Sequence, residues 1–172
     1  MLTVLIETHN DEEPLARTLA SLVPAAVEGL VRDVIVCDRQ SLDHTHQVAE
    51  HAGCLFLANG EIHTALRRAR GEWVLFLEPG ARLIDGWMDP VVAHAAKMAT
   101  PARFTRARED WPGFFTRVFS ARRPLADGLV MTRRQAMALG KSAASPEAIA
   151  RGLSARRLSA LISPAPVRAA RV

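Results

Sequence analysis

Short apolar runs alternate with helical patterns through the first hundred residues. The runs are uninterrupted, which is typical of strands buried on both faces of a parallel sheet. They predict strands at residues 2–6, 34–37, 54–57 and 73–77. Helices are expected from about Pro14 onward and at residues 45–52, 62–70 and 87–98. This order predicts an α/β fold with a central, mostly parallel sheet and helices on both faces. Gly71 is expected to end one helix in the left-handed conformation.

Polar stretches follow three of the predicted strands. They are residues 7–11, 38–43 and 78–82. The carboxyl ends of parallel strands meet at one edge of a sheet, and ligands of open α/β sheets bind outside that edge. We therefore expect the functional site to form where these three stretches come together.

The alternation weakens after residue 100. Residues 101–126 mix arginines with Trp111, Phe114, Phe115 and Phe119, and this mixture predicts an irregular, partly amphipathic segment. Beyond it we expect a strand at residues 127–132, helices at 133–139 and 146–161, and a frayed tail from residue 163.

Length and composition favour one globular domain spanning residues 1–172. Of the 172 residues, 49% are hydrophobic, which is enough for a substantial core. No apolar run approaches the roughly 20 residues of a membrane-spanning helix, and residues 1–13 lack the basic start of a signal peptide. A cytoplasmic location is the expectation. Cys37 and Cys54 are expected to be buried free thiols rather than a disulfide.

The charge is divided unevenly along the chain. Residues 1–100 carry 8 Lys and Arg against 14 Asp and Glu, a balance of −6, whereas residues 101–172 carry 14 against 4, a balance of +10. A basic surface favours polyanionic partners such as nucleic acid, anionic lipid or a phosphorylated substrate, and an arginine-rich genome gives the same composition. No P-loop, dinucleotide-binding or hydrolase-elbow motif is present, so these chemistries lack support. No zinc-finger or RNA-recognition motif is present either, so nucleic acid is not an expected partner.

Four segments share their pattern with one enzyme family. Residues 7–22 resemble the motif PTxNEExxLxxTLxSL, residues 34–45 resemble VIVVDGGSxDGT, and residues 69–77 resemble ARGxWLLFLxAD. Residues 124–134 resemble PYGDQxLFVRR. These are motifs of the family 2 glycosyltransferases, the last from a small bacterial branch. The resemblance spans roughly residues 2–140.

The resemblance implies a single Rossmann-like domain of the GT-A fold. Such enzymes transfer a sugar from a nucleoside diphosphate donor to an acceptor. Residues 1–100 would then be the nucleotide-binding half, and residues 101–172 the basic, acceptor-side part. The acceptor would be phosphorylated or lipid-linked, in the latter case with peripheral contact to an anionic membrane, since each Lys or Arg near such a surface contributes about 1 kcal/mol.

The same resemblance assigns candidate site residues. The donor site would be formed by Thr8, Asn10, Glu12, Asp38, Ser41 and Asp43. Asp127 would be the catalytic base that deprotonates the acceptor. Each assignment has a structural alternative: Asp43 caps a helix, Ser41 closes a turn, Glu12 complements a helix dipole, and Asp127 is a solvated loop carboxylate.

Several positions depart from the family pattern. Family members hold Mg²⁺ or Mn²⁺ on an Asp-x-Asp motif, but residues 78–81 here read Glu-Pro-Gly-Ala. Glu78 is then the only possible metal ligand, and one carboxylate is a poor site for a divalent ion. The late Glu-Asp motif is also absent, with Ser145, Pro146 and Glu147 near its place.

These departures leave two hypotheses open. In the first, arginines replace the metal as counter-charges to the diphosphate, because guanidinium groups suit phosphate oxygens. The candidates are Arg39, Arg67, Arg68 and Arg82. In the second, the domain is catalytically inactive and binds a nucleotide or a protein partner.

Overall fold

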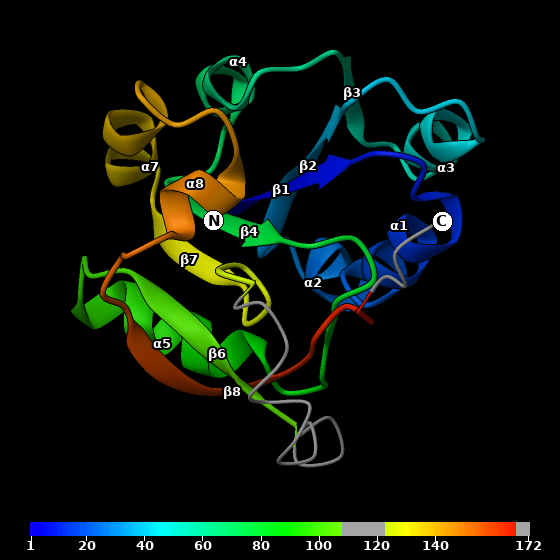
Figure 1. The fold of residues 1–172 in the computed structure, drawn as a ribbon. Coiled ribbons are helices and arrows are strands. Elements are labelled where there is room, and N and C mark those ends of the chain that lie inside the picture. The colour runs from blue at the N-terminus through cyan, green and yellow to red at the C-terminus, as the bar shows by residue number, and fades with distance from the viewer. Residues whose placement is uncertain (108–122, 168–172) are drawn as a thin grey trace.

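The computed structural model describes residues 1–107 and 123–167. Within them, eight strands form one curled, mixed sheet flanked by helices (Figure 1). The strands are β1 (Leu2–Thr8), β2 (Val31–Asp38), β3 (Leu55–Ala58), β4 (Trp73–Leu77), β5 (Arg82–Leu83), β6 (Ala102–Arg106), β7 (Leu129–Thr132) and β8 (Arg156–Ser163). The helices are α1 (Glu12–Ala20), α2 (Val23–Val27), α3 (Thr45–His51), α4 (Ile62–Arg68), α5 (Met88–Lys97), α7 (Arg133–Gly140) and α8 (Pro146–Ala150).

The four strands predicted in the first hundred residues form the parallel half of the sheet. The strand order is β3-β2-β1-β4-β7-β6-β8-β5. β1 pairs in parallel with both β2 and β4, and Thr8 lies opposite Asp38. β7 continues the sheet antiparallel to β4, with Phe76 opposite Leu129. Asp127, two residues before β7, therefore lies at the edge where β1, β2 and β4 end.

The other half of the sheet corrects two predictions. Residues 102–106, expected to be irregular, form β6, and the helix expected up to residue 161 ends at Ala150. Residues 156–163 form β8, which pairs in parallel with β6 and antiparallel with β5. Leu158, Ala160 and Ile162 are buried while the residues between them are exposed, a period of two that only a strand produces. The four aromatic residues of the expected irregular segment lie outside the described residues.

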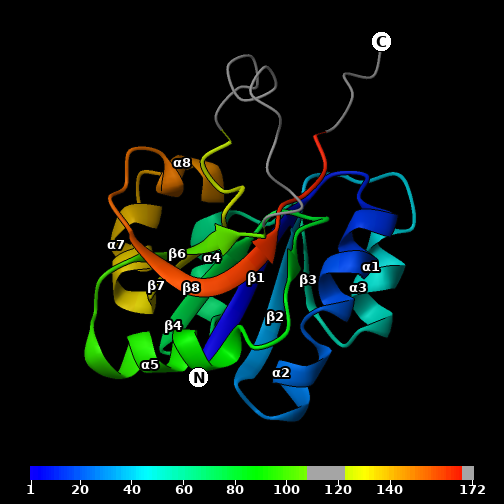
Figure 2. The ribbon, with the colours of Figure 1, turned by 90° about the horizontal axis from the view of Figure 1, so that it is seen from below.

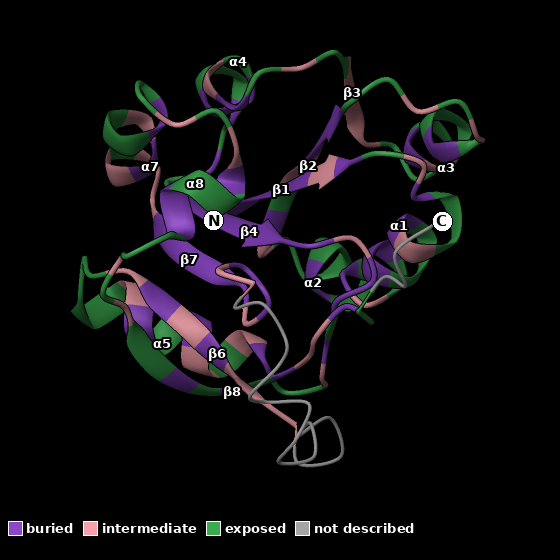
Figure 3. Cartoon of the chain, in the orientation of Figure 1, coloured by how far each residue is buried: buried purple, intermediate pink, exposed green. Residues whose placement is uncertain are grey.

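Helices cover both faces of the sheet, as predicted (Figure 2). Successive residues of β1 alternate between two buried clusters, with Val4 and Ile6 in one and Leu5 in the other. The first cluster includes residues of α1, α3 and α5, and the second includes residues of α4, α7 and α8. Figure 3 shows β1 and β4 buried along most of their length. Burial of each large apolar side chain contributes about 1.5–3 kcal/mol.

Gly71 serves a different purpose from the one predicted. It does not adopt a positive φ, and α4 has already ended at Arg68. Instead its backbone N–H donates a hydrogen bond to Thr3 Oγ1 at 2.8 Å. A Cβ on residue 71 would lie 2.5 Å from the Thr3 nitrogen, so glycine is needed for the close approach of two backbones.

No helix in residues 1–107 or 123–167 is long and apolar enough to cross a membrane. The two cysteines are free, and burial raises the pKa of Cys37 to about 12 and that of Cys54 to about 11.

Candidate functional site

Asp38 organises the loops at the carboxyl ends of β1 and β2. Its side chain is buried and accepts three hydrogen bonds within the chain. Thr8 Oγ1 donates to Oδ1 at 2.9 Å, the Ser41 backbone N–H donates to Oδ2 at 2.8 Å, and Ser41 Oγ donates to Oδ1 at 2.5 Å. The carboxylate therefore fixes the turn that follows β2 against the end of β1.

Asn10 joins the same loops from the other side. Its backbone N–H donates to Ser41 Oγ at 2.8 Å, and its side-chain Oδ1 accepts from the Leu42 backbone N–H at 2.7 Å. Asn10 and Gln40 both adopt the left-handed conformation, with φ of 53° and 56°. Such backbone is uncommon for residues other than glycine, although asparagine adopts it more readily than most, and it clusters at functional sites.

Asp43 connects the starts of two helices. Oδ1 accepts from the Thr45 backbone N–H at 3.0 Å, at the start of α3, and Oδ2 accepts from the Glu12 backbone N–H at 3.1 Å, at the start of α1. Partial burial opposes ionisation, but the hydrogen bond from the Thr45 hydroxyl, together with those from the two backbone N–H groups, outweighs it and lowers the pKa of Asp43. Asp43 thus binds backbone N–H groups at both helix starts, although the N-cap residues of α1 and α3 are Asp11 and His44. The side chain of Glu12 is about half exposed and pairs with His44 at 3.3 Å.

Glu7 and Arg39 form an ion pair that sequence reasoning did not identify. Arg39 Nε donates to Glu7 Oε1 at 2.7 Å, and a terminal nitrogen of Arg39 donates to the Ala144 carbonyl at 3.2 Å. Burial raises the pKa of Glu7, Arg39 opposes this shift, and Glu147 adds to it. Glu147 also raises the pKa of Glu78, so the first turn of α8 acts electrostatically on the ends of both β1 and β4.

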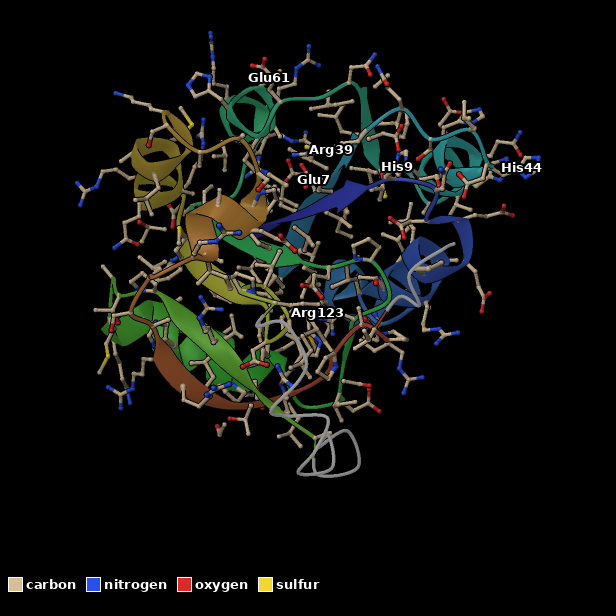
Figure 4. The ribbon with its side chains drawn as sticks, viewed as in Figure 1. Glu7, His9, Arg39, His44, Glu61 and Arg123 are labelled. Carbon is tan, nitrogen blue, oxygen red and sulfur yellow. The ribbon has the colours of Figure 1, made fainter. Side chains whose placement is uncertain are left out.

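Glu78 lies directly after β4 and pairs with Arg123. The side chain of Glu78 is 11% exposed, and Oε2 lies 3.2 Å from a terminal nitrogen of Arg123. Neither carboxylate oxygen accepts a hydrogen bond from the described residues. Burial therefore raises the pKa of Glu78, although Arg123 opposes the shift. Figure 4 shows Glu7 and Arg39 on one side of the end of β4 and Arg123 on the other.

Asp127 is held by two arginines. Oδ1 accepts from Arg106 Nε at 2.5 Å, and Oδ2 accepts from Arg157 at 2.8 Å. Burial opposes ionisation, yet the two guanidinium groups lower the pKa of Asp127. Its side chain is only 16% exposed, so it is not a solvated loop carboxylate. The pairing makes Asp127 a weaker base than a free carboxylate.

Replacing Asp127 by asparagine tests this arrangement. At neutral pH we expect the free energy of unfolding to fall by about 1–2 kcal/mol, because Arg106 and Arg157 lose a charged acceptor. The loss is not larger because Arg157 is largely exposed and solvent screens its ion pair. The native pKa of Asp127 lies below its ordinary value of 3.8. Its contribution is therefore full above that value and is lost as the pH falls through the native pKa. Urea unfolding should give curves for the two proteins that converge in acid, and a difference that does not change with pH would contradict the pairing.

The four proposed arginine counter-charges do not gather at one place in the fold. Arg67 and Arg68 lie at the end of α4, which leads into the amino end of β4, at the edge opposite the site. Arg82 lies on β5, four residues after Glu78 and opposite Ser163 at the carboxyl end of β8, and Arg39 is engaged by Glu7. Three arginines that were not proposed, Arg106, Arg123 and Arg157, pair with Asp127 or Glu78.

The residues at the metal-motif position do not fit a divalent cation. Glu78 is the only carboxylate of that segment, and it faces a guanidinium group that would repel a cation. Across residues 1–107 and 123–167, no group of three or more His, Cys, Asp or Glu is arranged to hold a metal ion.

The sequence model of glycosyl transferase family 2 matches residues 3–136, and the chain belongs to this family. This match confirms the resemblance found in the loop motifs. No curated protein sequence matches the chain.

Two solved enzymes share the GT-A fold with this chain. Mannosyl-3-phosphoglycerate synthase from Rubrobacter xylanophilus is 18% identical, with a TM-score of 0.60 over 78% of this chain and 54% of that one. Glucosyl-3-phosphoglycerate synthase from Mycobacterium tuberculosis, in complex with Mn²⁺, UDP-glucose and phosphoglyceric acid, is 18% identical, with a TM-score of 0.57 over 78% and 57% of the two chains. This chain spans little more than half the length of these proteins. The likeness confirms the predicted α/β fold.

Proposed function

We propose that the protein transfers a sugar from a nucleoside diphosphate donor to an anionic acceptor. The observation that carries the proposal is the network around Asp38, which joins two strained loops at the carboxyl edge of the sheet in a family 2 chain. The nucleoside would bind against this network, with Thr8, Asn10 and Ser41 holding the loops in place and Asp38 accepting a hydrogen bond from the base or ribose. Glu12 and Asp43 would support the adjoining helix starts.

The transfer step itself requires one proton acceptor. The acceptor oxygen forms a bond to the anomeric carbon, the bond from that carbon to the diphosphate oxygen breaks, and its electron pair leaves with the nucleoside diphosphate. The acceptor proton passes to a carboxylate. Asp127 is the base predicted from the sequence, but its oxygens are engaged by Arg106 and Arg157. Glu147, in the first turn of α8, is the alternative base at the same edge.

An arginine cluster supports an anionic acceptor. Arg106 of β6 and Arg157 of β8 both pair with one carboxylate, Asp127, which leaves an excess of positive charge. Arg103 of β6 interacts with Asp127 electrostatically and donates to the carbonyls of Pro124 and Ala150. Guanidinium groups suit phosphate and carboxylate oxygens. Three structures of the M. tuberculosis enzyme contain phosphoglyceric acid together with Mn²⁺ and a uridine nucleotide. A phosphorylated acceptor, free or lipid-linked, is the proposed class here.

The first test is a thermal-shift screen of UDP, GDP, dTDP and CDP, each with and without Mn²⁺. A ligand present at 100 times its Kd adds about 2.7 kcal/mol of stability, which is readily measured. We expect one nucleotide to raise the midpoint of unfolding clearly more than the others. The absence of a shift with all four nucleotides in both conditions would contradict the proposal.

A second candidate is a domain that binds the nucleotide without transferring sugar. The engagement of both Asp127 oxygens by guanidinium groups favours it. Incubation with UDP-glucose, with and without phosphoglyceric acid, separates the two candidates. UDP release that depends on the acceptor indicates transfer, whereas tight UDP binding without any release from UDP-glucose, across a panel of phosphorylated acceptors, indicates the binding module.

A further inference from the structure

The second position of the metal motif is built to exclude a carboxylate. Gly80 stands there with a φ of +96°, a conformation that residues with a side chain rarely adopt. A Cβ on residue 80 would lie 3.3 Å from Pro166 Cδ, 3.4 Å from Ala165 Cβ and 3.6 Å from Pro14 Cβ. The C-terminal segment at residues 164–167 thus packs where an aspartate side chain would begin. Backbone and packing both oppose a second metal ligand.

The first position of the motif faces an arginine instead of a cation site. Glu78 is nearly buried, its two oxygens accept no hydrogen bond from the described residues, and the guanidinium of Arg123 lies 3.2 Å from Oε2. Buried carboxylates normally have hydrogen-bond partners. A carboxylate that merely faces a guanidinium, without a well-formed hydrogen bond, is a partner that a phosphate group can replace.

The C-terminal segment also holds Arg123 in place. The terminal nitrogens of Arg123 donate to the Ala165 carbonyl at 2.6 Å and to the Pro166 carbonyl at 3.3 Å. A guanidinium group has five N–H donors, so these two bonds leave donors for another ligand. Because the carbonyls fix the group independently of Glu78, Arg123 would keep its position when that carboxylate is neutralised.

We infer that Arg123 takes the place of the divalent cation and binds the diphosphate of the donor directly. This inference rests on the proposed function and assigns the counter-charge at its site. A guanidinium fork matches two phosphate oxygens, and the charge stays in place without metal. Glu78 lies beside this guanidinium group and would compete with phosphate for it.

The substitution Glu78→Gln distinguishes the two mechanisms. If Glu78 holds a metal, Glu78→Gln weakens nucleotide binding in Mn²⁺. If Arg123 binds the phosphate, the same substitution removes a competing negative charge and strengthens binding or leaves it unchanged. This test does not depend on how well an Arg123 variant folds.

The experiment is isothermal titration of the full chain with UDP and GDP, in Mn²⁺ and in EDTA, and with inorganic pyrophosphate in EDTA. Arg123→Gln is compared with Arg123→Lys, Glu78→Gln and the control Arg134→Gln, an exposed arginine on α7 at the opposite edge. We expect binding to persist in EDTA. Arg123→Gln should weaken it about tenfold to a hundredfold, Arg123→Lys less, and Arg134→Gln not at all.

The remaining outcomes test the inference about Arg123 and the proposed transferase function separately. Binding that requires Mn²⁺ and is weakened by Glu78→Gln overturns the inference and leaves the proposed transferase intact. Unchanged binding by Arg123→Gln overturns it too, because Arg123 would then only anchor the C-terminal segment. Pyrophosphate binding that depends on Arg123, without any nucleotide binding, supports the inference and contradicts the function. No binding of any of the three probes overturns both.

Discussion

Replacement of Asp38 by alanine is expected to weaken nucleotide binding about a hundredfold and to lower the free energy of unfolding by about 1–3 kcal/mol. The carboxylate accepts hydrogen bonds from Thr8 and from the backbone and side chain of Ser41. Without it, a backbone N–H and two hydroxyl groups at a buried position lose their acceptor. The turn after β2 is then no longer fixed against the end of β1, where the nucleoside is proposed to bind.

The chain contains a matched control on the same two strands. Asp33 lies near the start of β2 and accepts a hydrogen bond from Thr3 of β1 at 2.6 Å, as Asp38 does from Thr8 at the other end. Asp33→Ala should lower stability to a similar degree without changing nucleotide affinity measured on the folded protein. Titration calorimetry and urea unfolding of both variants separate the two effects. Equal losses of affinity would show that the Asp38 network has no specific role in binding.

Most of the strands that sequence patterning located are buried on both faces, whereas β3, at the end of the strand order, is only partly buried. Residues 73–77 read as a continuous apolar run because both sides of β4 pack against helices. β8 is buried on one face only: Ser159 and the exposed Leu161 separate its buried positions, and two arginines precede them. The helix-forming composition of residues 146–161 therefore dominated the prediction, although Leu158, Ala160 and Ile162 carry the alternation of a strand.

The residues of the candidate site also differ in how far the sequence could predict them, according to the half of the sheet they belong to. Asp38, Asn10 and Ser41 follow strands of the parallel half, so topology alone brings them to one edge. The pairing of Glu78 with Arg123, and of Asp127 with Arg106 and Arg157, depends on β6, β7 and β8 joining the sheet. No local spacing marks those arginines, since their partners are distant in the sequence. Only the basic character of the C-terminal third indicated that an anion would be bound there.

Replacement of Gly71 by alanine is expected to cost about 3 kcal/mol or more in the free energy of unfolding. The added Cβ would lie 2.5 Å from the Thr3 nitrogen and 2.7 Å from the Leu2 carbonyl carbon. These are backbone atoms of β1, which is paired on both sides and cannot shift without disturbing β2 and β4. A flexible side chain could move away from the new methyl group, but this strand cannot.

Gly53→Ala separates the steric cost from the cost of backbone conformation. Gly53 has a φ of +71° and no atom within 4 Å of its would-be Cβ, so alanine there should cost only about 1 kcal/mol of conformational strain. Urea unfolding of the two variants, with equal m-values, gives the comparison directly. If Gly71→Ala costs no more than Gly53→Ala, the start of β1 is free to move. Typical domains have only about 5–15 kcal/mol of stability, so the expected loss at Gly71 would remove a large fraction of it. Gly71 lies at the opposite edge of the sheet from the proposed nucleotide site, so this loss is independent of nucleotide binding.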